Sequence, residues 1–138
     1  MSAHHHHAAT ELTRNQSLVF DVLSKAEGPL SAYTILDQLR DEGIRAPLQI
    51  YRALDKLLEY GMVHRVESLN AFVACADPHC SAHGITAFAI CEKCGQVDEF
   101  ADPLIEDRVR QWGAQHGFKP SKTTLELRGL CAQCQAAA

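Results

Sequence analysis

The sequence predicts an α+β protein in which an N-terminal winged helix-turn-helix is followed by a small α/β domain. Apolar residues recur with helical spacing in three segments before position 62, and with a spacing of two in two short segments between 62 and 75. Strand-like segments then flank one helical segment after position 84. Five of the six cysteines also lie after position 75, so composition divides the chain at the same place.

The three helical segments each have recognisable ends. The first ends at Gly28-Pro29, the second begins at Ser31 and ends at Gly43, and the third begins with Pro47 and ends at Gly61. The spacing of two over 62–67 and 71–75 predicts two strands joined by a short turn. Three helices followed by such a hairpin are the parts of a winged helix.

The second half contains strand-like segments at 85–91, 96–100 and 123–128. Asp102 is positioned to cap a helix with Pro103 at its first position, and Gly117 follows its end. Ile105, Val109 and Trp112 are expected to face inward from this helix.

The length of 138 residues allows one average domain or two small ones. Residues 76–84, rich in small and turn-forming residues, are interpreted as a linker between 11–75 and 85–138. Residues 1–10 form a His-rich tail outside both domains, interpreted either as a tag fragment or disordered segment or as an accessory metal-binding tail.

Composition restricts the function classes. The net charge of −4 disfavours a nonspecific polyanion binder but allows a sequence reader with a local basic face. No apolar run approaches the ~20 residues of a membrane span, and no secretory signal is present, so a cytoplasmic protein with no membrane partner is expected. Its cysteines are then metal ligands or thiols. No catalytic motif appears, and no enzyme activity is predicted.

The strongest motif is a pair of Cys-x-x-Cys turns, Cys91 with Cys94 and Cys131 with Cys134. Two such turns complete a closed tetrahedral four-sulfur shell, which predicts structural zinc with no open position for water. The alternative is a zinc/redox CxxC thiol protein. A redox pair, however, usually opens a helix after a strand and does not come doubled.

A second group offers mixed nitrogen, sulfur and oxygen donors. Each member alone has a plain role, such as a buried thiol or a solvated side chain. Together they suit Zn²⁺ well and Fe²⁺ less well, and a site that drew on both domains would link metal occupancy to domain geometry. The group comprises His64, Cys75, His79, Cys80, His83, Asp98, Glu99 and His116.

The outer face of the third helix carries side chains that can read DNA. Arg52 can grip guanine, Gln49 can read adenine, and the ring of Tyr51 can touch a thymine methyl. Lys56 lies on the same face, and Arg14 and Arg65 are candidate phosphate contacts. An ordinary solvated helix face is the alternative.

These segments resemble the ferric uptake regulator family, most closely its zinc-sensing branch. The resemblance runs from about Leu12 to Cys134. It is carried by Tyr51-Arg52-Ala53-Leu54-Asp55, Val63-His64-Arg65-Val66-Glu67-Ser68, Ile90-Cys91-Glu92-Lys93-Cys94-Gly95 and Gly129-Leu130-Cys131-Ala132-Gln133-Cys134. The chain departs from the family at Gln49-Ile50, where members commonly have Thr-Val.

The resemblance implies a zinc-responsive repressor that binds double-stranded operator DNA as a zinc-loaded homodimer, through an α/β dimerisation domain, and controls zinc-uptake genes. A Fur-type iron- or peroxide-responsive repressor is the alternative within the family. The resemblance assigns structural zinc to the four paired cysteines and DNA reading to Tyr51 and Arg52. It also assigns regulatory zinc to His64, Cys75, His83 and Glu99. A further metal at His116, joined by Asp98, His79 or Cys80, is a weaker implication.

Overall fold

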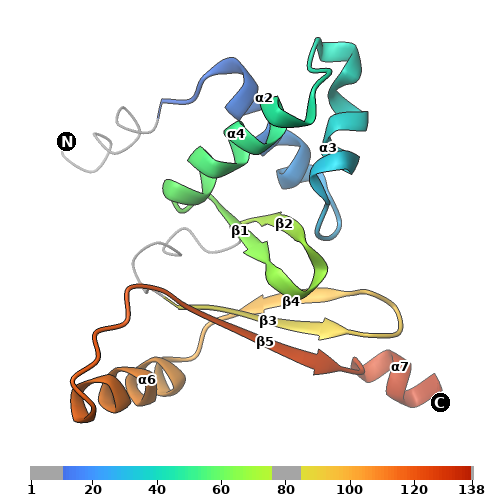
Figure 1. The fold of residues 1–138 in the computed structure, drawn as a ribbon. Helices are drawn as coiled ribbons and strands as arrows, with labels where there is room; N and C mark the ends of the chain where they lie inside the picture. Colours follow the sequence, from blue (N-terminus) through green and yellow to red (C-terminus); the bar gives the residue numbers. More distant parts are fainter. Residues whose placement is uncertain (1–10, 76–84, 138) are drawn as a thin grey trace, which may run out of the picture. The chain divides into compact units, whose positions relative to one another are not determined.

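The computed structural model describes residues 11–75 and 85–137 of the chain. The chain divides into two compact units, Met1–Cys75 and Ala76–Ala138. Figure 1 colours the first unit blue to green and the second yellow to red. The expected linker, 76–84, and the His-rich tail, 1–10, lie outside the described residues.

Three helices form most of the first unit: α2 (Arg14–Lys25), α3 (Ala32–Leu39) and α4 (Pro47–Glu59). A short 3-10 helix, η2 (Arg40–Glu42), extends α3 before Gly43 turns the chain with a φ of 94°. Thr13 caps α2 and Ser31 caps α3, each through a side-chain oxygen that accepts a backbone N–H. The expected starts at Ser31 and Pro47 are therefore confirmed, while α2 ends at Lys25, three residues before Gly28, and its cap Thr13 was not predicted.

The core of the first unit lies between these helices. Ile35 from α3 and Ile50, Leu54 and Leu57 from α4 are fully or almost fully buried, and Val19 of α2 packs in the same cluster. These α4 positions recur at intervals of three and four, which is why one face of the helix is apolar. The opposite face of α4 is left to solvent.

A two-stranded antiparallel hairpin follows α4, with β1 (Val63–Val66) joined to β2 (Ala71–Ala74) through the 3-10 helix η3 (Glu67–Leu69). Asn70 adopts a left-handed φ of 49° at the turn, where asparagine is well tolerated. Phe72 of β2 exchanges two backbone hydrogen bonds with Leu30, of 2.8 and 3.0 Å. This bridge ties the hairpin to the segment before α3 and completes a winged helix-turn-helix.

The second unit contains a three-stranded sheet in the order β4-β3-β5. Strand β3 (Ile85–Cys91) pairs antiparallel with β4 (Val97–Phe100) and parallel with β5 (Thr123–Gly129). The helix α6 (Pro103–Gln115) lies between β4 and β5 in sequence, as a parallel pairing requires. A last helix, α7 (Ala132–Ala137), was not expected from the sequence. The α+β fold class is confirmed.

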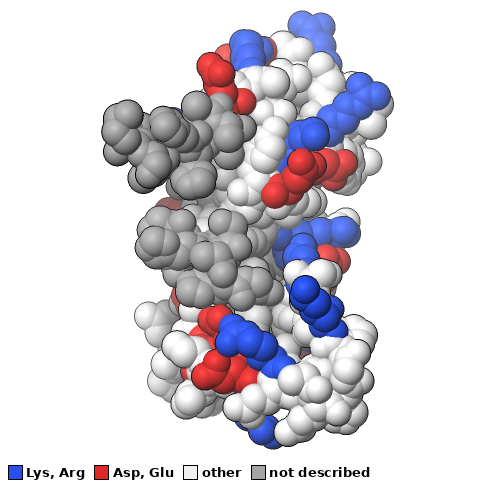
Figure 2. Space-filling view, turned by 90° about the vertical axis from the view of Figure 1, so that its left-hand side faces the viewer, with Lys and Arg blue, Asp and Glu red and all other residues white. Residues whose placement is uncertain are grey.

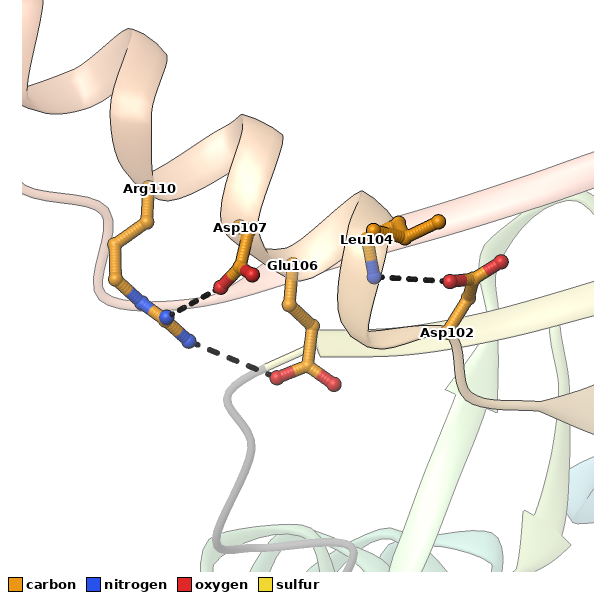
Figure 3. Close-up of polar contacts among 5 residues, drawn as sticks. All are labelled: Asp102, Leu104, Glu106, Asp107 and Arg110. Atoms are coloured by element: carbon orange, nitrogen blue, oxygen red, sulfur yellow. Dashed lines mark hydrogen bonds and ion pairs between the residues drawn. The ribbon is translucent and has the colours of Figure 1, made fainter.

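The start of α6 is held by side chains that Figure 3 shows. Asp102 accepts a hydrogen bond of 2.9 Å from the backbone N–H of Leu104, as expected of a cap. Arg110 pairs with Asp107 at 3.1 Å and with the largely buried Glu106 at 3.7 Å. One turn of α6 thus carries two acids and a base that stabilise it.

The expected inward orientation of Trp112 is wrong. Its side chain is 54% exposed; its ring stacks on that of His116, with centroids 4.3 Å apart, and meets that of Phe118 edge-on at 6.1 Å. Its neighbour Gly113 is the buried residue. The carbonyl oxygen of Phe118 packs so closely against Gly113 that a Cβ at this position would collide with it. The chain thus packs backbone, rather than the indole, at this point.

Among residues 11–75 and 85–137, no helix combines the length and the apolar character needed to cross a bilayer.

Candidate metal centre and nucleic-acid interface

The four paired cysteines come together at one end of the sheet in the second unit. Cys91 is the last residue of β3, and the parallel register places it opposite Gly129, the last residue of β5. The turn after β3 brings Cys94 back over Cys91, with Gly95 at a φ of 81°. Cys131 directly precedes α7, and Cys134 lies in its first turn.

The geometry of this cluster fits a zinc ion. The four sulfur atoms all lie within 4.8 Å of one another, and the sulfurs of Cys94 and Cys131 are 3.8 Å apart. A Zn–S bond of about 2.3 Å in a tetrahedron separates its sulfurs by roughly 3.8 Å. The four thiolates would fill the coordination sphere, so this site can hold structural zinc and leaves no position for a reactive water.

Hydrogen bonding makes the four thiols unequal. The backbone amides of Cys94 and Cys131 lower the pKa of Cys91 to about 5. The sulfur of Cys91, followed by that of Cys131, raises the pKa of Cys134 to about 12. For Cys94, the Gln96 amide acts to lower the pKa, but the Cys91 sulfur and burial outweigh it and raise the pKa. Without metal, the cluster therefore favours one thiolate beside protonated thiols, which a cation would deprotonate.

Two residues of the predicted regulatory site belong to the hairpin of the first unit. His64 of β1 lies opposite Val73 of β2, and Cys75 follows β2 with its N–H donated to the carbonyl of Met62 at 2.9 Å. Strand alternation places His64, Val73 and Cys75 on one face of the hairpin. Cys75 is disulfide-bonded in this structure, and a zinc ligand at this position requires its reduced thiolate.

The other predicted metal ligands are distributed over the second unit. Glu99 lies in β4 opposite Phe88 of β3, while His83, His79 and Cys80 lie outside the described residues. Asp98 accepts hydrogen bonds from the side chain of Gln96 at 3.0 and 3.3 Å. The Nδ1 of His116 lies 2.9 Å from the carbonyl of Trp112. A further metal at these positions stays a prediction.

The outward face of α4 presents the predicted DNA-reading residues. Tyr51, Arg52 and Lys56 are exposed, while Ile50, Ala53 and Leu54 on the opposite face are buried. Gln49, Arg52 and Lys56 line a groove with Thr13, Asn15 and Gln16 from the start of α2. A helix with one face in the core and a polar face along a groove is the arrangement by which a winged helix presents side chains to a major groove.

The predicted DNA-contacting cations differ in their partners. Arg14 pairs with Glu42 at 3.5 Å, Lys56 pairs with Glu59 at 3.5 Å, and Arg65 pairs with Glu67 at 3.7 Å. Arg65 also donates to the side chain of Asn70 at 2.8 Å. Among the described residues, Arg52 makes no ion pair or hydrogen bond, so its guanidinium is available to a ligand.

Basic and acidic side chains are interspersed on the face that Figure 2 shows, with uncharged surface between them. The basic residues on this face do not gather into one continuous patch. Such a surface favours recognition by a few placed side chains over nonspecific attraction to phosphates.

Comparison with known proteins gives a consistent picture. The model of the ferric uptake regulator family matches residues 7–128. The chain belongs to the ferric uptake regulator family. The zinc uptake regulation protein of Escherichia coli K12 is 40% identical over 124 residues, which cover 89% of this chain and 72% of that protein.

Two solved structures are also similar to this family member. Holo XcZur superimposes with a TM-score of 0.81 at 41% identity and covers 92% of this chain and 87% of its own. A zinc uptake regulator complexed with zinc and DNA gives a TM-score of 0.85 at 38% identity, covering 94% of this chain and 86% of its own.

The role of Gln49 in the fold of α4 was missed by the sequence interpretation. Its side-chain oxygen accepts the backbone N–H groups of Arg45 and Ala46, each at 3.2 Å. A signal was present in the sequence. Glutamine at the third position of a helix is the residue that reaches back to the N-cap, and Pro47 marks the first position.

Proposed function

We propose that this family member is a zinc-responsive transcriptional repressor that controls zinc-uptake genes. In this proposal it acts in the cytoplasm as a homodimer that binds double-stranded operator DNA when loaded with zinc, and it is not an enzyme. The observation that carries the proposal is the combination of a four-cysteine cluster with zinc geometry and a winged helix whose Arg52 is available to DNA. The similarity to zinc uptake regulators supports the same function.

DNA recognition is assigned to Tyr51 and Arg52 on α4. Arg52 is exposed and can form two parallel hydrogen bonds to a guanine edge, which is the commonest specific contact in the major groove. Tyr51 is 36% exposed beside it and offers a ring edge to a thymine methyl. Arg14, Lys56 and Arg65 each have an acidic partner to exchange for a phosphate, so they contribute affinity rather than sequence choice.

Regulatory zinc is assigned to His64, Cys75, His83 and Glu99. The shared face of the hairpin supports His64 and Cys75 as neighbouring donors, and a soft thiolate together with an imidazole favours zinc over iron. Because the four ligands come from both units, one ion bound to all of them would link the units. That link lowers the conformational cost of placing two recognition helices in successive major grooves, ~34 Å or a multiple apart.

The test is operator binding by the full chain at buffered free zinc, under reducing conditions so that Cys75 is a thiol. Zinc is expected to tighten binding by about 5- to 150-fold. Cys75→Ser should abolish this dependence while zinc remains at the four-cysteine cluster after mild chelation. Arg52→Ala should abolish the preference at the base pair that Arg52 reads, at any zinc level.

The outcomes separate the parts of the proposal. An unchanged zinc dependence in Cys75→Ser would overturn the ligand assignment alone. Operator binding driven by Fe²⁺ at lower free concentration than Zn²⁺ would favour an iron-responsive repressor. Reversible disulfides within the two Cys-x-x-Cys turns, with no zinc retained, would favour a thiol protein.

A further inference from the structure

The carboxamide oxygen of Gln49 is already hydrogen-bonded within the protein, whereas its NH₂ group, within the described part of the chain, is not. Its Oε1 accepts hydrogen bonds of 3.2 Å from the backbone N–H groups of both Arg45 and Ala46. Ala46 is the N-cap of α4 and has no side-chain acceptor, so Gln49 supplies the side-chain cap of this helix. Both partners are donors, so the carboxamide orientation follows: the oxygen faces the backbone and the NH₂ group points away.

The NH₂ group of Gln49 is therefore the end that can contact a ligand. Among the described residues it donates no hydrogen bond. Gln49 is half-buried and lines the groove that also contains Arg52, the exposed guanidinium assigned to base reading. The two side chains stand three positions apart on α4, so they are neighbours on one face of the helix.

A capped Gln49 cannot make the usual pair of contacts to adenine. That pair uses the carboxamide NH₂ as donor to adenine N7 and the carboxamide oxygen as acceptor from adenine N6. With Oε1 held by α4, only the donor remains. Guanine N7 and O6 and thymine O4 are acceptors in the major groove and fit such a donor.

We propose that Gln49 is a specificity-determining residue whose Nε2 donates to an acceptor edge, guanine or thymine, at one base pair in each half-site. This inference rests on the proposed function, since it concerns how the same recognition helix reads its operator. The cap also makes Gln49 a positioning residue, because it fixes the first turn of the helix that carries Arg52.

The test is selection of zinc-dependent binding sites from DNA randomised across a half-site, with the full chain and three variants. Gln49→Glu keeps an oxygen on the two backbone amides, and its charge suits a helix N-terminus, so its Tm is expected to match the parent. It lacks the donor and should lose the guanine or thymine preference at that pair. Gln49→Met lacks both groups, so it should lose the same preference together with a few degrees of Tm.

Gln16→Glu is the matched control for added negative charge. Gln16 caps α2 in the same way, with its Oε1 accepting the N–H of Thr13 at 3.1 Å, and it lines the same groove. This variant should weaken binding to all sequences alike and leave base preference unchanged.

Loss of one donor contact in Gln49→Met should weaken binding to the selected operator by roughly 3- to 10-fold.

Three results would overturn parts of this interpretation. Selection of adenine at the Gln49-dependent pair would show that the carboxamide oxygen leaves the backbone amides of α4 and contacts the base. Unchanged base preference in both Gln49 variants would show that the Gln49 side chain contacts the DNA backbone or makes no contact with the DNA. Either result would leave the proposed function standing, whereas no zinc-dependent selection by the parent chain would overturn that function as well. Substituting 7-deazaguanine then separates guanine N7 from the O6 and thymine O4 acceptors by whether binding is lost.

Discussion

The two units differ in how they bury apolar surface. Among the described residues, 15 buried hydrophobic residues lie in the first unit and four lie in the second. The smaller second unit also exposes five large apolar side chains, Leu104, Trp112, Phe118, Leu127 and Leu130, against four in the first unit. A small domain with so little core needs other sources of stability, such as a metal or a partner surface. The four-cysteine cluster can supply the first, and the proposed homodimer would supply the second.

Removing zinc should therefore damage the two units unequally. Cys91→Ser, or exhaustive chelation, is expected to unfold the second unit, since structural zinc contributes about 10 kcal/mol or more in small zinc domains. The first unit should keep its helices, because its core includes no cysteine. Circular dichroism melting with zinc analysis measures both effects. Cys75→Ser is the matched control and should retain one zinc; a single unchanged melting transition in Cys91→Ser would contradict this comparison.

A cavity made in the core of the first unit should destabilise the first unit and leave the second unit folded, the reverse of zinc removal. Leu54 is fully buried on α4, so Leu54→Ala is expected to cost about 2–5 kcal/mol of the free energy of unfolding of that unit. Zinc at the four-cysteine cluster should be retained. Leu48→Ala, at a side chain that is 57% exposed on the same helix, is the control and should change stability little. Loss of zinc from Leu54→Ala would show that the second unit depends on the first for its fold.

Zinc loading of the second unit should be steeply pH-dependent. The raised pKa values of Cys94 and Cys134, the latter about 12, mean that both thiols must lose protons to bind zinc. These two protons alone make zinc affinity fall by at least roughly 100-fold per pH unit as the pH falls from 8 to 6, since each released proton gives a factor of ten. Cys91, with its pKa lowered to about 5, adds a further proton only near and below that pH. Competition with a chelator of known pH dependence measures the slope; a flat profile would contradict it.

The exposed aromatic cluster of the second unit should affect association more than folding. Trp112→Ser removes an indole that is 54% exposed in the single chain, so the stability of the monomer should change little. If this surface contributes to the homodimer, the dissociation constant should rise by roughly tenfold or more, as for other buried tryptophans at interfaces. Sedimentation equilibrium measures this. Tyr33→Ser, at an exposed ring of the first unit, is the control and should leave the dimer unchanged.

Sequence alone predicted the main helices and strands other than α7, because these depend on local spacing, and the spacing of the cysteines predicted the metal cluster. Apolar periodicity, caps such as Ser31 and Asp102, and glycines near helix ends predicted the helices, and alternation predicted the strands. Two Cys-x-x-Cys turns predicted a tetrahedral site, and the parallel register of β3 and β5 brings those turns together.

Tertiary structure decided which individual residues are buried and which polar atoms are available, because periodicity alone does not predict either. Trp112 and Gly113 occupy adjacent positions, and only the close approach of the Phe118 carbonyl determines that the glycine is the one buried. The sequence offered Gln49 as a free reader of adenine, but the fold turns its oxygen onto the first amides of α4. A helix end must satisfy its own backbone donors, and this need determines which polar atoms remain available to DNA.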